Sequence, residues 1–268
     1  MDISLEIVII LILLGILSGA ISSLTGIGGG IFYISTMVFL IAIPINEARD
    51  TSTFIIVIFS GVAFFRYFKQ GKIDLKLCLI FATFAILGGI TATIVFLIFP
   101  LDNLMLKIVI ATVVIISGIN MIYKAIITRN SEKKKGIDID EGFTFENFNY
   151  KANLKKGIPL FFLSGFIAYL TGVGGGIVNV PALNIFLGLP IHNATAVSTA
   201  IIFFVGIYNT IARIFLGVIH YYVGVLIATG AVIGALIGTK LSNKIPKSSL
   251  QFLVAFVLIG LAIRLYFA

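Results

Sequence analysis

The longest apolar runs of this chain exclude a soluble fold. Between Leu75 and Phe99 the only charged residue is Lys76, and the run from Leu250 to Leu261 has no charge. Hydrophobic residues make up 59% of the 268 residues and charged residues 11%, which is too little charge to cover a soluble domain. Because about 20 apolar residues cross a hydrocarbon core of about 30 Å, we expect an all-α polytopic membrane protein, embedded in the bilayer of the cell membrane.

Breaks in the hydrophobic pattern predict about ten segments in two sets of five. The first set is 5–24, 28–43, 51–68, 75–99 and 103–127, and the second is 157–170, 176–189, 195–216, 221–240 and 249–267. Between the sets, residues 128–156 form the only long polar stretch. We therefore divide the chain into a first transmembrane repeat (1–127), a charged linker (128–156) and a second transmembrane repeat (157–268).

The two sets are copies of one sequence. TGIGGG at 25–30 returns as TGVGGG at 171–176, and a shift of 146 residues aligns 17–31 with 163–177 at eleven identical positions of fifteen. The same shift places Pro44 on Pro190 without a gap. Chance similarity between apolar helices would match leucine and isoleucine rather than prolines and glycines in register. The chain is therefore predicted to contain an internal duplication.

The distribution of lysine and arginine predicts that the second copy is inverted. A copy with five segments, an odd number, makes the next copy enter the membrane from the other side, and the basic loops do exchange places between the copies. Fifteen of the nineteen basic residues then fall on one face, together with the linker. By the positive-inside rule this face is cytoplasmic. Both chain termini are accordingly expected on the extracytoplasmic side.

The duplicated glycine clusters are the candidate substrate site. Glycine accepts positive φ and close backbone approach, and the free N–H groups of a helix that starts after a break favour an anion. Discontinuous helices in inverted repeats supply the binding sites of many secondary transporters. The candidate substrate-binding residues are Thr25, Gly26, Gly28, Gly29, Gly30, Ser52, Thr53, Thr171, Gly172, Gly174, Gly175, Gly176, Asn179, Ser198 and Thr199.

Glycine and hydroxyl residues in membrane helices also serve close packing and helix-to-helix hydrogen bonds, and this alternative stays open for each candidate. We prefer packing for Gly15, Gly19 and the glycines at 230, 234 and 238. Among charged residues, Arg66 and Arg213 are expected to extend to the membrane interface, and attraction of anions is the functional alternative for either. Glu47, Arg49 and Asp50 are expected to form a local ion pair rather than a coupling-ion site.

Several functional classes lack their sequence signals. With two histidines and one cysteine the chain offers no metal-ligand spacing, and it has no catalytic triad or paired intramembrane acids, so we expect no enzyme activity and no cofactor. The net charge of +8 is explained by cytoplasmic loops rather than by nucleic-acid binding. Whether the chain forms a homo-oligomer is left open by the sequence.

At the glycine clusters the sequence resembles the TauE/SafE family, the sulfite exporter or anion permease proteins. TGVGGGIVNVPAL at 171–183 and GLPIHNATAVSTA at 188–200 are similar to the glycine-rich motif of that family and the hydroxyl stretch downstream of it. The first copy departs from the motif, because Ser35 stands where Pro181 stands. The resemblance implies a membrane permease for sulfite or small organosulfonates. We expect a secondary transporter of a small anion that works by alternating access; an anion channel and a non-transport membrane protein are the alternatives.

The charge pattern makes a topological prediction. In a variant without the native Cys78, single cysteines at Lys72, Lys134 and Lys244 should react with an impermeant maleimide only from the cytoplasmic face, and cysteines at Asn103 and Asn193 only from outside. The measurement is labelling of intact cells against inverted vesicles. Labelling of positions 72 and 244 from opposite faces would remove the argument for inversion.

Overall fold

The computed structural model describes residues 4–99, 103–135, 145 and 154–242, with single positions between 244 and 263. All regular elements of this part of the chain are helical, which confirms the all-α prediction. They are α1 (Leu5–Thr25), α2 (Gly30–Ile41), α3 (Ile45–Lys69), α4 (Leu75–Ile98), α5 (Asn103–Lys135), α6 (Leu154–Thr171), α7 (Gly176–Pro181), the π-helix η3 (Ala182–Phe186), α8 (Ile191–Leu216) and α9 (Tyr221–Leu241).

Five of these helices, α1, α3, α4, α8 and α9, are long and apolar enough to cross a membrane. Large apolar side chains stay exposed on their outer faces, among them Leu17, Ile94 and Phe215, as expected for surfaces in contact with lipid. Helix α5 continues to Lys135, so the first part of the predicted linker is helical. The rest of the linker, apart from Phe145, and most of the predicted tenth segment (249–267) lie outside the described residues.

Helices α3 and α8 begin earlier than the hydrophobic pattern predicts. Each follows a proline, Pro44 or Pro190, with φ and ψ of −53° and 142° in the first copy and −51° and 143° in the second. The fixed φ of proline favours a helix start, where the missing N–H is not needed. The charged stretch 47–50, predicted to precede its segment, therefore lies in the first two turns of α3.

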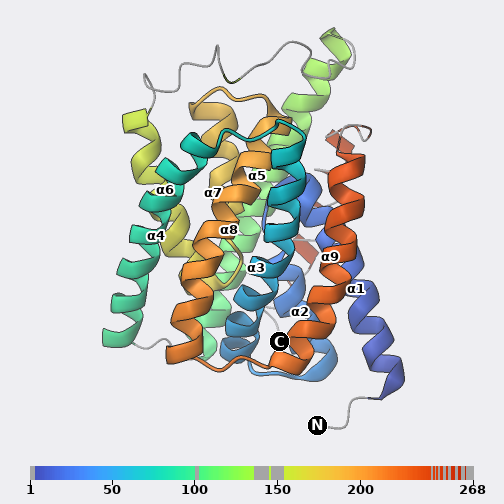
Figure 1. Ribbon diagram of the computed structural model, residues 1–268, viewed down its shortest axis with the longest axis vertical. Helices are drawn as coiled ribbons and strands as arrows, with labels where there is room; N and C mark the ends of the chain where they lie inside the picture. The colour runs from blue at the N-terminus through green and yellow to red at the C-terminus, as the bar shows by residue number, and fades with distance from the viewer. Residues whose placement is uncertain are drawn as a thin grey trace.

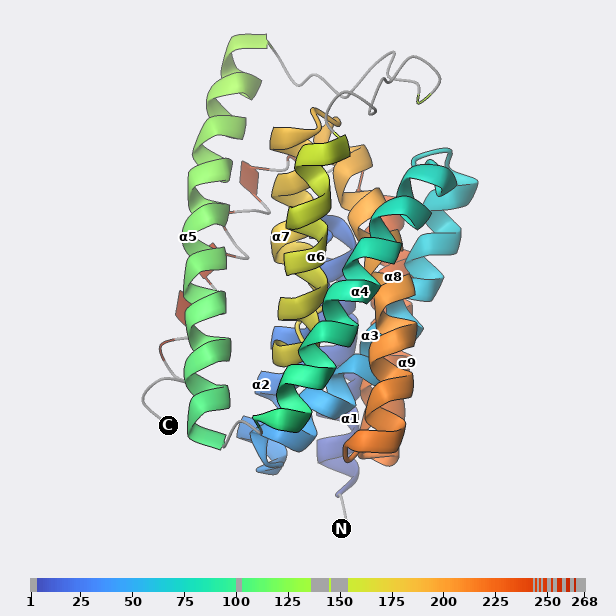
Figure 2. The same ribbon diagram turned by 90° about the vertical axis from the view of Figure 1, so that its left-hand side faces the viewer.

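Two pairs of helices turn back inside the molecule. Helices α1 and α2 have their outer ends at the end of the molecule where the N-terminus lies, and α6 and α7 at the opposite end, where α5 ends at Lys135 (Figures 1 and 2). In the first copy α2 is a continuous α-helix through Ser35. In the second copy Pro181 ends α7, and the π-helix η3 continues it. Proline lacks the N–H for the regular helix ladder, and this accounts for the difference.

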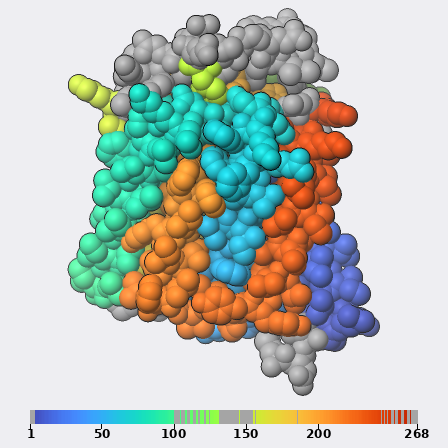
Figure 3. Space-filling model, viewed as in Figure 1, coloured from blue at the N-terminus to red at the C-terminus, as the bar shows by residue number. Residues whose placement is uncertain are grey.

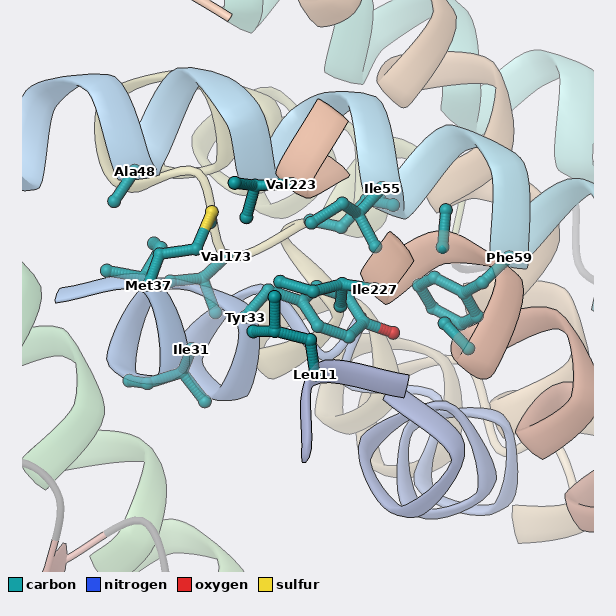
Figure 4. Packing of buried hydrophobic residues seen from close by; sticks show 14 of the residues in the cluster. Leu11, Ile31, Tyr33, Met37, Ala48, Ile55, Phe59, Val173, Val223 and Ile227 are labelled. Atoms are coloured by element: carbon teal, nitrogen blue, oxygen red, sulfur yellow. The ribbon is translucent and has the colours of Figure 1, made fainter. Parts of the chain in front are cut away.

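The core lies around these pairs. Helix α3 is packed between α8 and α9 (Figure 3). Tyr33 of α2 lies among Leu11, Ile227 and Phe59 from three other helices (Figure 4), and its ring meets that of Phe59 edge to face at 6.0 Å. Each broken pair is thus enclosed by complete helices, which hold the two turns at the centre of the molecule.

Small residues allow α1 and α9 to approach at backbone distance. A Cβ on Gly230 would overlap the carbonyl oxygen of Ile12, and one on Gly234 would overlap that of Ile16. A Cβ on Gly19 would overlap the carbonyl oxygen of Ala231. These contacts confirm that the glycines of α1 and α9 serve packing, as small residues do between membrane helices.

This packing predicts that a methyl group added at Gly234 lowers the stability of the protein, whereas one added at Gly206 does not. Gly234→Ala should destabilise the protein by about 1–3 kcal/mol, because backbone must move apart to admit the methyl group. Gly206→Ala is the matched control, since its Cβ would meet Val57 at an ordinary 3.5 Å. Thermal unfolding in detergent should show a fall of about 2–4 °C for each kcal/mol in the first variant only. Equal unfolding temperatures for the two variants would contradict this account of the α1–α9 contact.

Candidate functional site

The two glycine clusters form turns of nearly identical backbone shape. The φ values are 69°, 108° and 70° at Gly26, Gly28 and Gly29, and 67°, 99° and 73° at Gly172, Gly174 and Gly175. L-residues with a side chain rarely adopt these angles. The glycines are therefore required by the backbone itself, independently of any ligand.

The two turns are in direct contact with each other. A Cβ on Gly28 would lie 3.2 Å from the Cα of Gly174, and a Cβ on Gly174 would lie 3.3 Å from the Cα of Gly28. A Cβ on Gly30 would overlap the carbonyl oxygen of Gly172, and one on Gly176 would overlap that of Gly26. In this conformation the backbones touch, and the space between Gly28 and Gly174 is too small for an anion.

Two serines tie the turns together reciprocally. Ser52 Oγ of the first copy donates a hydrogen bond of 2.7 Å to the carbonyl oxygen of Gly172 in the second copy. Ser198 Oγ of the second copy donates one of 2.7 Å to the carbonyl oxygen of Gly26 in the first. The two serines are equivalent under the 146-residue shift. Each copy therefore satisfies a buried backbone acceptor of the other, which lipid could not do.

The remaining hydroxyl candidates bond their own helices. Thr25, Thr53, Thr171 and Thr199 each donate to a carbonyl oxygen three or four residues earlier, over 2.7–2.9 Å. Asn179 is buried, and its Oδ1 has no partner among the described residues. Since an anion needs donors and these hydroxyl hydrogens already face carbonyls, the four threonines offer it none in this conformation.

Several backbone N–H groups of the two turns have no hydrogen-bond acceptor among the described residues. In the described part of the chain, the N–H groups of Gly28 and Gly29 make no hydrogen bond, and the same holds for Gly174 and Gly175. Helix α2 begins at Gly30 and α7 at Gly176, so both sets lie at the positive end of a helix dipole. For α2, a helix of three turns, these N–H groups are unsatisfied donors, and their use by an anion stays a prediction.

A buried charged cluster, which the sequence reasoning did not include in the site, lies beside the second turn. Arg49 Nη2 is 2.8 Å and Arg213 Nε 3.2 Å from Oδ1 of Asp50, and all three side chains are at most 5% exposed. The sequence predicts a local ion pair within 47–50 without naming its members; Arg49 and Asp50 form it, and Glu47 instead contacts His220. The predicted placement of Arg213 at the membrane interface is wrong, because α8 directs this side chain into the protein.

Neighbouring groups hold this charged cluster in place. Arg213 Nη2 donates to the carbonyl oxygen of Tyr169 over 2.8 Å. Both guanidinium groups face the Phe96 ring, at 4.6 Å for Arg49 and 5.3 Å for Arg213. The second carboxylate oxygen of Asp50 accepts the N–H of Val218, in the loop between α8 and α9. Cation–π contacts of this kind strengthen when water is excluded.

A small cavity of about 10 Å³ adjoins the second glycine turn. It is lined by Thr53, Ile56, Ala168, Gly174, Ile202, Val205, Gly206 and Asn209. Such a volume holds about one water molecule. Thr53 lies one helical turn after Arg49, and Asn209 one turn before Arg213, so the cavity lies one turn deeper in the protein than the charged cluster.

The serine bonds between the turns make a stability prediction. Ser52→Ala and Ser198→Ala should each cost about 1–3 kcal/mol, because a buried carbonyl oxygen loses its donor. Thr83→Val is the control, since Thr83 is exposed and bonds only its own helix. Chemical or thermal unfolding in detergent measures the difference. Serine variants as stable as the control would show that these two bonds do not hold the turns together.

Comparisons with known proteins find similar chains that are described as probable membrane transporters. The probable membrane transporter proteins YunE and YdhB of Bacillus subtilis are each 25% identical to the chain, over 97% of both chains for YunE and over 91% of this chain and 93% of YdhB. A probable membrane transporter protein of Methanocaldococcus jannaschii is 25% identical, over 93% of this chain and 91% of its own. No solved structure gives a significant match. The model of the family described as sulfite exporter TauE/SafE matches residues 11–265, and the chain therefore belongs to the TauE/SafE family.

Proposed function

We propose that this protein is a secondary transporter that moves a small anion across the cell membrane by alternating access. Its family and its curated relatives indicate a membrane transporter. Sulfite, an organosulfonate or a related sulfur-containing anion is the proposed cargo, because the family description names sulfite. The fold supports the alternating-access mechanism, and the charged and polar groups of the site support a negatively charged cargo.

One observation carries the proposal: two broken helix pairs approach from opposite ends of the molecule and meet at turns of the same shape. Secondary transporters place their sites where discontinuous helices of inverted repeats meet. The reciprocal bonds of Ser52 and Ser198, and the equivalent prolines Pro44 and Pro190, support an inverted five-plus-five arrangement. The linker would then be cytoplasmic and the termini extracytoplasmic.

Movement in this scheme takes place at the contact between the turns. The contact between the turns consists of glycine backbone and two serine bonds, so separating the turns themselves breaks few interactions, whereas the packing of α1 on α9 keeps the two copies joined. The glycines and hydroxyls predicted from sequence would then line the route that opens. In the closed conformation the contact blocks passage, which favours a transporter over a permanently open channel.

The donor groups favour an anion as cargo. Unpaired N–H groups at the start of α2, with two buried arginines against a single buried aspartate, leave the centre of the protein positive. A cation would meet repulsion at this point, whereas an anion is stabilised by both sets of groups.

Transport in liposomes tests the proposal. Purified protein in liposomes preloaded with unlabelled sulfite should accumulate radiolabelled sulfite faster than in empty liposomes, because an alternating-access carrier exchanges substrate across the membrane. Uptake should saturate with concentration. Liposomes without protein give the background, and sulfate, thiosulfate and methanesulfonate should be screened in the same way.

A variant pair locates the moving contact. In Gly28→Ala the methyl group would lie 2.7 Å from the carbonyl oxygen of Val173, whereas the Gly206→Ala methyl group has ordinary room. The first variant should lose most exchange and the second should keep it. Uptake that never saturates and shows no acceleration by internal substrate would instead indicate a channel. An absence of flux for the whole panel would remove the proposal.

A further inference from the structure

We propose that Arg49 and Arg213 form the anion-binding centre of this protein, with Asp50 as an internal counter-ion that occupies the centre while it is closed. The preferred cargo is then a small, singly charged oxyanion of the sulfonate type. This inference rests on the proposed transport function and deepens it, by naming the residues that hold the cargo and the charge that the cargo carries.

The charge balance of the cluster is the first step. Two guanidinium groups and one carboxylate leave one positive charge, on side chains that are at most 5% exposed. An uncompensated charge in such a place is costly. The Nη1 atoms of Arg49 and Arg213 are both buried and have no hydrogen-bond partner among the residues that the structure describes. One further negative group with two or three oxygens would balance the charge and accept from these donors.

The internal repeat shows that the arginine charge exceeds what the fold requires. The 146-residue shift places Arg213 on Tyr67, and Tyr169 on Ser23. Tyr67 Oη donates to the carbonyl oxygen of Ser23 over 2.7 Å, as Arg213 donates to that of Tyr169. A neutral phenol therefore fills the same structural position in the other copy.

The other members of the charged cluster also lack a charged counterpart in the second copy. Arg49 and Asp50 align with Thr195 and Ala196. A structural role shared by the two copies explains the backbone bond, but it does not explain why one copy alone carries charge there. A ligand needed once per molecule does explain it.

The surroundings suit an oxyanion. A guanidinium group presents a planar fork of donors that matches sulfo, carboxylate and phosphate oxygens. The Phe96 ring faces both groups and leaves their edges as the polar contact surface. One turn deeper, Asn209 lines the cavity with an unpaired Oδ1, and rotation of its amide would present the NH₂ donor instead.

Asp50 connects the occupancy of the centre to the opening of the protein. Its carboxylate bridges both arginines and also accepts the N–H of Val218. An incoming oxyanion that binds the unpartnered Nη1 groups and shares the arginine donors with the carboxylate would weaken the hold of the arginines on Asp50, and with it the link to the loop between α8 and α9, while Asp50 keeps its charge at the centre. Binding would thereby loosen one end of the molecule, as a carrier requires.

Equilibrium binding to the purified full-length protein, by calorimetry with methanesulfonate, sulfite, sulfate and chloride, tests this inference. Arg49→Gln and Arg213→Gln should weaken methanesulfonate binding about tenfold or more, because charged hydrogen bonds are lost. Asp50→Asn should strengthen it, because the internal competitor is removed. With two positive charges instead of one, that variant should also shift its preference towards sulfate. Chloride should compete weakly throughout.

Tyr67→Phe is the matched control, since it removes the equivalent backbone bond without a change in charge, and its affinity should stay within about twofold of the wild type. Arg49→Lys and Arg213→Lys, which keep the charge but lose the planar fork of donors, replace the glutamine variants if those do not fold.

Folded arginine variants with unchanged affinity would overturn the inference, and so would weaker binding by Asp50→Asn. If the wild type exchanges anions while the arginine variants bind normally, only this inference fails; if the wild type neither binds nor moves the panel, the transport proposal fails as well.

Discussion

The contact between two glycine turns is the constraint on which the rest of the structure depends. The backbones of Gly28 and Gly174 approach so closely that any side chain on either would be crowded. Such an approach requires positive φ at three positions in each turn. It also requires that the buried carbonyl oxygens of Gly26 and Gly172 find donors within the protein, and Ser52 and Ser198 are placed to supply them.

The symmetry of this contact makes the asymmetry beside it informative. Prolines, glycines and serines keep the same geometry in both copies, because the backbone imposes the same demands on each. Tyr67 and Arg213 satisfy one such demand with different chemistry. Both copies need a donor to the same backbone carbonyl, but only the second copy meets this need with a charged side chain. The extra charge is therefore available to bind the cargo. In a duplicated fold, the features that both copies share can thus be assigned to stability, and the features found in one copy alone to ligand recognition.

Sequence reasoning located the glycine turns and missed the charged cluster, and both results have a physical cause. Glycine has a use that no other residue can meet, so its recurrence in register identified the turns. Arginine and aspartate are ambiguous in a membrane sequence. They occur where a membrane segment ends, and they also occur inside a protein as buried ion-pair networks. The charges at 47–50 therefore seemed to mark a loop, although Pro44 had already started α3 before them. Arg213 is buried because of the direction in which α8 presents it, and the residues next to Arg213 in the sequence do not reveal that direction.

The sequence by itself determined the membrane class, the duplication and the positions of the two breaks, because apolar length and irreplaceable glycines are local properties of the chain. It also showed the family, through the motif that the second copy retains. Only the tertiary structure decided that the two turns touch, that their serines bond across the copies, and that Arg213 joins Asp50. These contacts join residues more than a hundred positions apart, and their partners are chosen by helix packing rather than by sequence neighbours.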